Sequence, residues 1–412
     1  MKYIKIIIIL ILLLVITFSI FFLLNNKQKK QENKMIDLSE KTILEIEEYA
    51  VLNNLELIIE REYSDTIPKD KLISQSIEIG TILNNQKQLT VVISLGLLNK
   101  EEYAKYGVNE LGRVPIMMYH GIHNIKSSDT AYTGGNIDKD GYQRTAEAFR
   151  NDLEFYYSNG YRMIRLKDYI DGIIDVPLGK SPIILTFDDG LENNFRINGL
   201  DEDGNLIIDP NCAVGILEEF KRKYPDFNVT ATFFLNSGLF QQPKYNNLIL
   251  KWLVEHGYDI GNHSYSHADF TSIDKDKSQM EIGRMYQKLN EIIPGQYVNI
   301  VALPFGSPYK KEHANFPFIL EGKYNDFSYK TEATLRVGWE SELSPFNKNF
   351  DKTFLKRIRA YDNNGLEFDI EMNFKNLKQN RYISDGNKDK IVIPESSLKH
   401  IKEGLTLEII TY

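Results

Sequence analysis

The sequence predicts an α/β protein with a smaller α+β unit and an apolar N-terminal segment. From Val114 onward, short apolar runs of strand length alternate with helical stretches, a pattern typical of parallel strands joined by helical crossovers. Before them, residues 36–97 combine one helical stretch with alternating polar and apolar residues. The N-terminus is dominated by an apolar run from Ile6 to Leu24. A chain of 412 residues is too long for one ordinary domain, so we expect two domains with additional segments.

Residues 1–30 are predicted to form an uncleaved signal anchor, a single membrane-spanning helix. The apolar run is interrupted only by Thr17 and Ser19 and is long enough to cross the hydrocarbon core of a bilayer. No small-x-small site follows it, which argues against the alternative, a cleaved signal peptide. The flanking lysines weakly favour a cytoplasmic location for the rest of the chain, but long downstream domains can override this bias. These lysines are Lys2 and Lys5 before the run, and Lys27, Lys29, Lys30 and Lys34 after it.

Charge and cysteine content exclude several classes of protein and site. The formal net charge of −8 argues against a nucleic-acid partner. Cys212 is the only cysteine, so neither an intrachain disulfide nor a cysteine-rich zinc site can form. Any metal bound by this chain must therefore be held by histidines and carboxylates.

Residues 36–97 are predicted to fold as a small helix-on-sheet module. An amphipathic helix begins near Ile43, and the clearest strands are Leu72–Gln75 and Leu89–Ser94. The segment resembles a PASTA domain over its whole length, on the helix and on the sequence PKDKLISQSIEIGT. That resemblance implies an extracytoplasmic module associated with the bacterial cell wall; a generic spacer fold is the alternative. The residues that match the family's positions are Pro68, Ser74, Gln75, Gly80 and Thr81.

The remaining residues divide into a linker, a large α/β region and a tail. Residues 98–112 are rich in charge and are predicted to be a linker. Residues 113–365 carry the α/β pattern, with VPIMMYHGI, SPIILTFDDG, VTATFFLNSG and YDIGNHSYSH as strands followed by polar residues. Residues 366–412 are expected to form a C-terminal extension of β-rich or mixed structure.

Polar residues gather at the ends of these predicted strands. Asp188 and Asp189 follow the apolar run 183–185, and adjacent like charges at the tip of a strand are costly unless something compensates them. His263 and His267 are four residues apart, a spacing that suits a shared metal ion. Each feature alone has a common structural explanation, but two histidines and a carboxylate at strand ends together indicate a metal-hydrolase site. The other two elements of this set are Tyr119–His120 and Pro304–Phe305–Gly306.

Residues 113–365 resemble the NodB-type polysaccharide deacetylases, the fourth family of carbohydrate esterases. The resemblance rests on TFDDG and HSYSH, with ATFF and DIGNH as flanking strands. It implies a deformed (β/α) barrel that binds a divalent metal through Asp189, His263 and His267. It also implies that Asp188 is the general base. Zn²⁺ is the favoured ion, and Co²⁺ and Ni²⁺ also suit this ligand set.

Two departures from the family's pattern concern the partner of the base and the general acid. Most members have an arginine, paired with the base, where this chain has Ala302, so we expect Asp188 to be less constrained. The late Leu-x-His motif of the acid is matched only by Leu398–His400, in the C-terminal extension. A branch with permuted motifs lacks this arginine and has its acid histidine in an early Tyr-His strand. MMYHG and ALPFG resemble that branch, which implies that His120 is the general acid.

The same resemblance gives the Pro304–Phe305–Gly306 turn a role in binding the oxyanion and the substrate. The backbone N–H of Phe305 is the implied oxyanion donor. Glu332, Arg336 and Trp339 lie where other members keep supporting residues, but the match is too loose to assign them roles.

These features predict a metal-dependent deacetylase that hydrolyses N-acetyl groups of a GlcNAc-containing cell-wall polymer. The PASTA-like module favours peptidoglycan as that polymer. One alternative is a deacetylase of the exopolysaccharide poly-N-acetylglucosamine, which the early placement of His120 favours. Others are a catalytically weak protein that binds wall glycan and a deacylase for a non-glycan acyl group. The predicted location is the bacterial cell membrane, spanned once, with the catalytic domain outside the cytoplasm.

Overall fold

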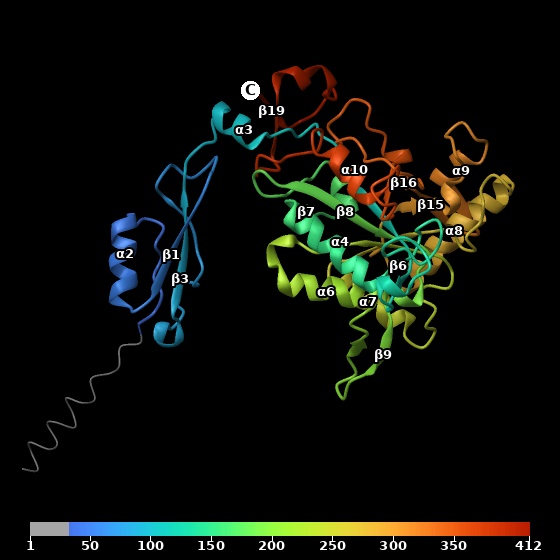
Figure 1. Ribbon diagram of the computed structural model, residues 1–412, viewed down its shortest axis with the longest axis horizontal. Helices are drawn as coiled ribbons and strands as arrows, with labels where there is room; N and C mark the ends of the chain where they lie inside the picture. The colour runs from blue at the N-terminus through green and yellow to red at the C-terminus, as the bar shows by residue number, and fades with distance from the viewer. Residues whose placement is uncertain (1–32) are drawn as a thin grey trace, which may run out of the picture. The chain divides into compact units, whose positions relative to one another are not determined.

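The structure is a computed structural model that describes residues 33–412 (Figure 1). The predicted signal anchor at residues 1–30 lies outside the described residues. Between residues 33 and 412, no helix combines the length and the apolar character needed to span a bilayer. The chain divides into two compact units, with the boundary between Asn99 and Lys100.

The first unit is a three-stranded sheet packed against one helix. Strand β3 (Gln88–Ser94) lies in the middle, parallel to β1 (Glu56–Glu62) and antiparallel to β2 (Leu72–Gln75). Helix α2 (Ile43–Leu52) begins at a capping box formed by Thr42 and the side chain three residues later. The helix and the two strands predicted for this module are therefore present. Its core includes Leu38, Ile46, Leu89, Val91 and Ile93, and a short 3₁₀ turn, η1, spans Leu83–Asn85.

The second unit is built on a curled sheet of eight parallel strands. The strand order is β16-β13-β12-β11-β8-β4-β17, and β7 pairs with β8 beside this path. The backbone N–H of Arg336 donates to the carbonyl of Leu355 (2.8 Å), which ties the edge at β16 to the segment that leads into β17. The predicted α/β alternation is confirmed, and the sheet forms a half-barrel. The strands are β4 (Ile116–Tyr119), β7 (Tyr161–Met163), β8 (Ser181–Phe187), β11 (Thr232–Leu235), β12 (Asp259–Asn262), β13 (Ile300–Ala302), β16 (Ala333–Leu335) and β17 (Ile358–Arg359).

Two apolar cores lie on the two faces of this sheet. Alternate strand residues such as Met117 and Leu185 pack under the helices, and Figure 1 shows α4, α6 and α7 on that face. Their neighbours Ile116 and Ile184 point into the curled side, where a second core forms. The helices are α4 (Ala146–Ser158), α5 (Leu166–Ile170), α6 (Ala213–Lys223), α7 (Asn246–Glu255), α8 (Lys275–Ile292), α9 (Phe316–Leu320) and α10 (Ile370–Leu377).

Short strand pairs and 3₁₀ turns complete the unit. Two pairs are antiparallel hairpins, β9 (Ile197–Leu200) with β10 (Leu206–Ile208) and β14 (Glu321–Tyr324) with β15 (Phe327–Lys330). Two pairs are parallel and join segments distant in sequence. These are β5 (Ile122–His123) with β6 (Arg144–Thr145), and β18 (Lys390–Ile393) with β19 (Glu408–Thr411). The 3₁₀ turns are η2 (Ser127–Asp129), η3 (Glu192–Asn194), η4 (Pro225–Phe227), η5 (Pro304–Gly306), η6 (Lys352–Phe354) and η7 (Glu395–His400).

Residues 98–112 differ from the predicted linker, because most of them are part of the second unit. Helix α3 (Lys100–Tyr106) begins that unit, and its Tyr103 is buried. Glu110 is only 1% exposed, although it lies in a charge-rich sequence. The charged residues that suggested a linker cover one side of the segment, and its other side is buried against the end of the chain.

Residues 366–412 are likewise not a separate extension. The hydroxyl of Tyr382 donates to Glu110 (2.9 Å), and so does the backbone N–H of Val392 (2.7 Å). Ile391 and Ile393 on β18 belong to the core on the curled side of the sheet. The C-terminal segment therefore completes the second unit rather than following it.

The buried Glu110 predicts a pH dependence of stability. Burial and the neighbouring Asp385 raise the pKa of Glu110 to about 8. Between the ordinary pKa of a glutamate and a pH of about 8, the folded protein keeps a proton on Glu110 that the unfolded chain has lost. The free energy of unfolding therefore falls as pH rises through this window. Glu110→Gln should remove this contribution. Urea denaturation of both proteins across the window measures it, and parallel pH profiles for the two proteins would contradict it.

Candidate metal centre and active site

The predicted site residues meet at the carboxyl ends of neighbouring parallel strands. Asp188 and Asp189 follow β8, and His120 follows β4 beside it. His263 follows β12, and the Pro304–Gly306 turn follows β13. Because all these strands run parallel, their loops lie at the same edge of the sheet, where α/β enzymes carry their chemistry. The strand order therefore brings together residues that are far apart in the sequence.

Three of these side chains form a candidate metal centre. These are Asp189, His263 and His267, whose ligand atoms all lie within 4.8 Å of one another. Oδ1 of Asp189 lies 3.2 Å from Nε2 of His263 and 3.3 Å from Nε2 of His267. The backbone of Asp189 is left-handed (φ 75°), and the next residue, Gly190, could not carry a Cβ because it would lie 2.1 Å from the carbonyl oxygen of Leu239. The turn is thus shaped to aim this carboxylate at the histidines.

The donor set fits a divalent cation. Nδ1 of His263 lies 2.8 Å from the backbone carbonyl oxygen of Ala302. Because a carbonyl can only accept a hydrogen bond, Nδ1 carries the proton and the lone pair of Nε2 is free. Nε2 of His263 and Oδ1 of Asp189 are both buried without a hydrogen bond. Buried polar atoms rarely lack partners, and two histidines with one carboxylate are a common ligand set with open positions. Asp189, His263 and His267 would hold the ion.

The carboxylate of Asp189 is also held in its ionised form. Burial alone would raise its pKa, but His263 and His267 outweigh this effect and hold the pKa well below its usual range. His267 is about one-third exposed, so this side of the candidate metal centre opens to solvent. An ionised carboxylate beside an accessible imidazole is the state that a cation requires.

Asp188 is locked in a buried ion pair with Arg357. The guanidinium donates two parallel hydrogen bonds, from Nη1 to Oδ1 (2.8 Å) and from Nη2 to Oδ2 (2.7 Å). It also donates to the hydroxyl of Thr186 (3.1 Å) and to the backbone carbonyl of Arg336 (2.8 Å). Burial would raise the pKa of Asp188, but the Arg357 guanidinium outweighs it and the pKa is lowered. The carboxylate is therefore fixed in position and ionised.

This pair corrects the expectation that Asp188 lacks an arginine partner. Ala302 stands at the position where the resemblance implied an arginine, but the arginine that pairs with Asp188 is Arg357, directly before β17, an edge strand of the sheet. One sign of this strand is visible in the sequence, because RIR at Arg357–Arg359 alternates charged and apolar residues as a half-buried strand does. Nothing in the sequence indicated that β17 lies beside β4.

His120 faces the same site. Its Nδ1 is buried without a hydrogen bond, and its ring lies 5.1 Å from the ring of Tyr142 in an edge-on contact. Burial lowers the pKa of the imidazole, and Asp188 and Asp189 act in the opposite direction. The alternative acid, His400, is exposed on η7. The assignment of His120 as the general acid remains a prediction.

The Pro304–Gly306 turn forms one wall beside the histidines. Phe305 has a left-handed backbone (φ 59°) and is 56% exposed, whereas Pro304 and Gly306 are buried. Its ring lies 4.5 Å from the ring of His267. An exposed aromatic ring next to a metal ligand offers an apolar surface to a substrate. The predicted oxyanion role of the Phe305 N–H is not tested by this arrangement.

Comparisons with known proteins confirm the two resemblances. A family model described as polysaccharide deacetylase matches residues 175–315, and the PASTA domain model matches residues 33–95. The chain therefore contains a polysaccharide deacetylase domain and a PASTA domain. The matched deacetylase segment includes Asp188, Asp189 and both histidines of the candidate metal centre, but neither His120 nor Arg357.

Individual relatives are similar over limited segments. The chain is 28% identical over 130 residues to the peptidoglycan-N-acetylglucosamine deacetylase of Bacillus cereus, covering 32% of this chain and 38% of that protein. It is 30% identical over 113 residues to an uncharacterized 30.6 kDa protein of Geobacillus stearothermophilus, covering 27% and 34%. The chain thus spans little more than a third of the length of these relatives. The structure of the Streptococcus pyogenes deacetylase PplD in complex with acetate aligns with 65% of this chain and 98% of its own, at 19% identity and a TM-score of 0.44.

The ion pair between Asp188 and Arg357 predicts a large stability effect. Arg357→Met leaves a carboxylate buried without its partner, so we expect the free energy of unfolding to fall by about 3–5 kcal/mol. Arg357→Lys, which keeps the charge but not the paired hydrogen bonds, should lose less. Urea denaturation measures both. Arg381→Met is the matched control, because that arginine is partly exposed and contacts the Tyr161 ring; an equal loss there would contradict the prediction.

Proposed function

We propose that this protein is a metal-dependent deacetylase that removes N-acetyl groups from a GlcNAc-containing cell-wall polymer, with peptidoglycan as its substrate. The observation that carries the proposal is the adjacent pair of carboxylates with separate partners. Asp189 faces two histidines, whereas Asp188 is buried against Arg357. One carboxylate is therefore suited to bind a cation and the other to accept a proton beside it.

The side chains around the site account for the proton movements of amide hydrolysis. A bound divalent cation would supply an activated water and polarise the acetyl carbonyl. Asp188 takes a proton from the attacking water, and Arg357 keeps this carboxylate oriented. His120, as imidazolium, donates a proton to the sugar nitrogen as the C–N bond breaks, which yields acetate and a free amine. The N–H of Phe305 donates to the carbonyl oxygen as it becomes negative.

The substrate and the location are inferred from the rest of the chain. The PASTA domain supports a protein that works at the cell wall, and the Bacillus cereus relative is named for peptidoglycan N-acetylglucosamine. We infer that residues 1–30 anchor the chain in the cell membrane and that both domains lie outside the cytoplasm. Zn²⁺ is the inferred ion, because two imidazoles and a carboxylate suit it.

Removal of the metal tests the reaction and the substrate together. The full-length protein loaded with Zn²⁺ should release acetate from peptidoglycan, a chelator should abolish the release, and added Zn²⁺ should restore it. Acetate measured on parallel samples of peptidoglycan and poly-N-acetylglucosamine distinguishes the two polymers. No release from either polymer by protein with measured bound metal would contradict the proposal and favour a glycan-binding protein.

The division of labour between the two aspartates gives a paired prediction. Asp188→Asn should lower kcat at least about 100-fold, because it removes the base, and should leave the bound metal in place. Asp189→Asn is the matched control at the adjacent position and should lose the metal itself. Acetate release and metal content are measured on the same preparations. Loss of metal from the Asp188 variant, or its retention by the Asp189 variant, would reverse the two roles.

A further inference from the structure

A second arginine, Arg359, lies two residues after Arg357, in the short strand β17. In strand β17, Ile358 packs into the core under the helices, so Arg357 and Arg359 both point to the opposite, curled side of the sheet. Arg357 reaches the base at the end of β8. Arg359 lies two residues further along the strand, toward the carboxyl edge where the site residues gather. Its position is therefore at the rim of the candidate active site.

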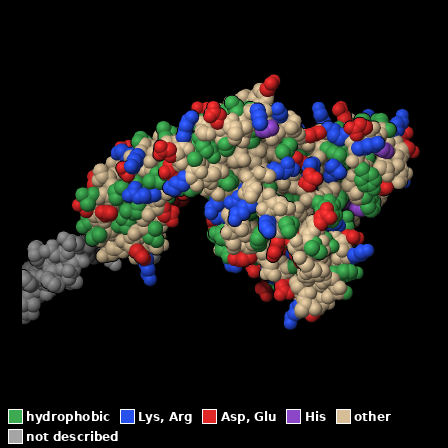
Figure 2. Space-filling view, turned by 45° about the horizontal axis from the view of Figure 1, so that its top comes forward, with side chains coloured by type: hydrophobic (Ala, Val, Ile, Leu, Met, Phe, Trp, Pro, Cys, Tyr) green, Lys and Arg blue, Asp and Glu red, His purple; other side chains and the backbone are tan. Residues whose placement is uncertain are grey.

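Arg359 is a buried cation that forms no ion pair with a carboxylate among residues 33–412. Many lysine and arginine side chains lie on the surface seen in Figure 2, where water solvates them. Among residues 33–412, four arginines are buried, and three of them form ion pairs with aspartates. Arg359 is 4% exposed, and its Nε and Nη1 are buried without a hydrogen-bond partner in the described part of the chain. The three paired arginines are Arg144, Arg162 and Arg357.

Three aromatic rings lie close to this guanidinium. Its Cζ lies 3.6 Å from the ring centroid of Trp339 and 4.3 Å from that of Tyr142. Tyr361 is further away, at 5.6 Å. Rings stabilise the cation through its faces, but they do not satisfy the N–H groups in its plane. The arrangement holds the guanidinium rigidly and leaves the N–H groups at its edge for a ligand with paired oxygens.

The acidic side chains nearby are used elsewhere. The carboxylate of Asp138 accepts the backbone N–H groups of Asp140 (3.0 Å), Tyr142 (3.1 Å) and Gln143 (2.8 Å), so it shapes the turn that carries Tyr142. Asp140 is exposed, and both it and Asp138 act on the charge of Arg359 through space without forming an ion pair with it. The turn thus presents an aromatic ring to Arg359 and keeps its carboxylates out of direct contact.

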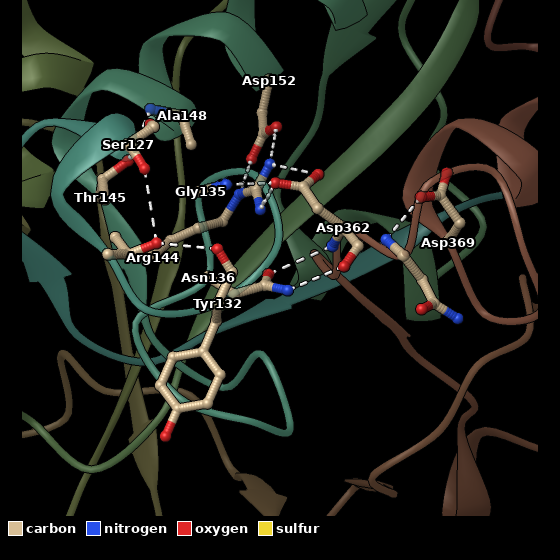
Figure 3. A network of polar contacts seen from close by, with 12 residues as sticks. Ser127, Tyr132, Gly135, Asn136, Arg144, Thr145, Ala148, Asp152, Asp362 and Asp369 are labelled. Carbon is tan, nitrogen blue, oxygen red and sulfur yellow. Dashed lines mark hydrogen bonds and ion pairs between the residues drawn. The ribbon is translucent and has the colours of Figure 1, made fainter.

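A buried network holds this turn against the end of β17 (Figure 3). Arg144 donates to both oxygens of Asp152 (2.6 Å each) and to Asp362 (2.9 Å), which follows β17 in the chain. The side-chain amide of Asn136 donates to the backbone carbonyl of Asp362 (2.8 Å). The rings around Arg359 are therefore fixed before any ligand arrives, which lowers the entropic cost of binding.

The arrangement also connects Arg359 to the reaction. The ring of Tyr142 touches the guanidinium on one side and lies edge-on to the ring of His120, 5.1 Å away. We propose that Arg359 binds an oxyanion carried by the glycan, a carboxylate or a phosphate close to the acetamido group that is cleaved. This specificity rests on the proposed deacetylase function. The enzyme then prefers GlcNAc residues next to an anionic substituent over those in a neutral polymer.

The test compares substrates that differ in charge. Three glycans are used: a neutral GlcNAc oligomer, peptide-free glycan strands with free lactyl carboxylates, and a GlcNAc oligomer carrying a phosphodiester. KM and kcat are measured for the full-length protein, Arg359→Gln, Arg359→Lys and the control Arg381→Gln. Arg359→Gln should raise KM for one anionic glycan about 10- to 100-fold, with kcat little changed. KM for the neutral oligomer should not change, and Arg359→Lys should restore part of the preference.

The outcomes separate this inference from the proposed function. The anionic glycan that loses affinity in Arg359→Gln identifies the group as carboxylate or phosphate. If Arg359→Gln raises KM equally for neutral and anionic glycans, or for neither, the inference is overturned. Deacetylation of the neutral oligomer would still uphold the proposed enzyme. If no glycan releases acetate, the binding of the same glycans measured by calorimetry still tests the inference. An affinity that depends neither on the charge of the glycan nor on Arg359 would overturn it. Thermal unfolding of each variant shows whether it is folded.

Discussion

The active site depends on one buried ion pair, that between Asp188 and Arg357. Arg357 is fully buried and Asp188 is 1% exposed, so neither charge is solvated and each requires the other. The pair joins the loop after β8 to strand β17 across β4, which lies between them. The edge strand of the sheet is therefore bound to the loop that carries Asp188, because without Arg357 this residue would be a buried, unpaired carboxylate. The ion pair thus adds to the pairing with β4 in holding β17 at the edge of the sheet.

The same requirement explains why the catalytic unit extends beyond the segment that resembles known deacetylases. The matched residues 175–315 contain the candidate metal ligands and the base, but the strands that flank β8 on one side, β4 and β17, lie outside them. Glu110 and Tyr382 then join the start and the end of the unit inside one core. A chain trimmed to the matched segment would lack both His120 and the partner of Asp188.

Sequence reasoning succeeded where the signal is local. TFDDG and HSYSH each place their ligands within five residues, and the alternation of strands with helices indicated the parallel sheet. It failed where burial depends on distant partners. Arg357 directly precedes a strand of only two residues, β17, and its role depends on a strand order that no periodicity encodes. Glu110 looked like part of a solvated linker for the same reason, since the strand that buries it comes almost at the end of the chain.

The charges on the curled side of β17 are not equivalent, although Arg357 and Arg359 lie two residues apart. The charge of Arg357 is compensated within the protein by Asp188. Among residues 33–412, Asp189 faces two histidines rather than an arginine, and Arg359 forms no ion pair with a carboxylate. A site with one uncompensated group of each sign is complementary to a ligand that brings the opposite charges. A bound cation would supply one of these charges, and we infer that the other comes from the substrate, since the rings around Arg359 can stabilise its cation but cannot accept the hydrogen bonds of its edge.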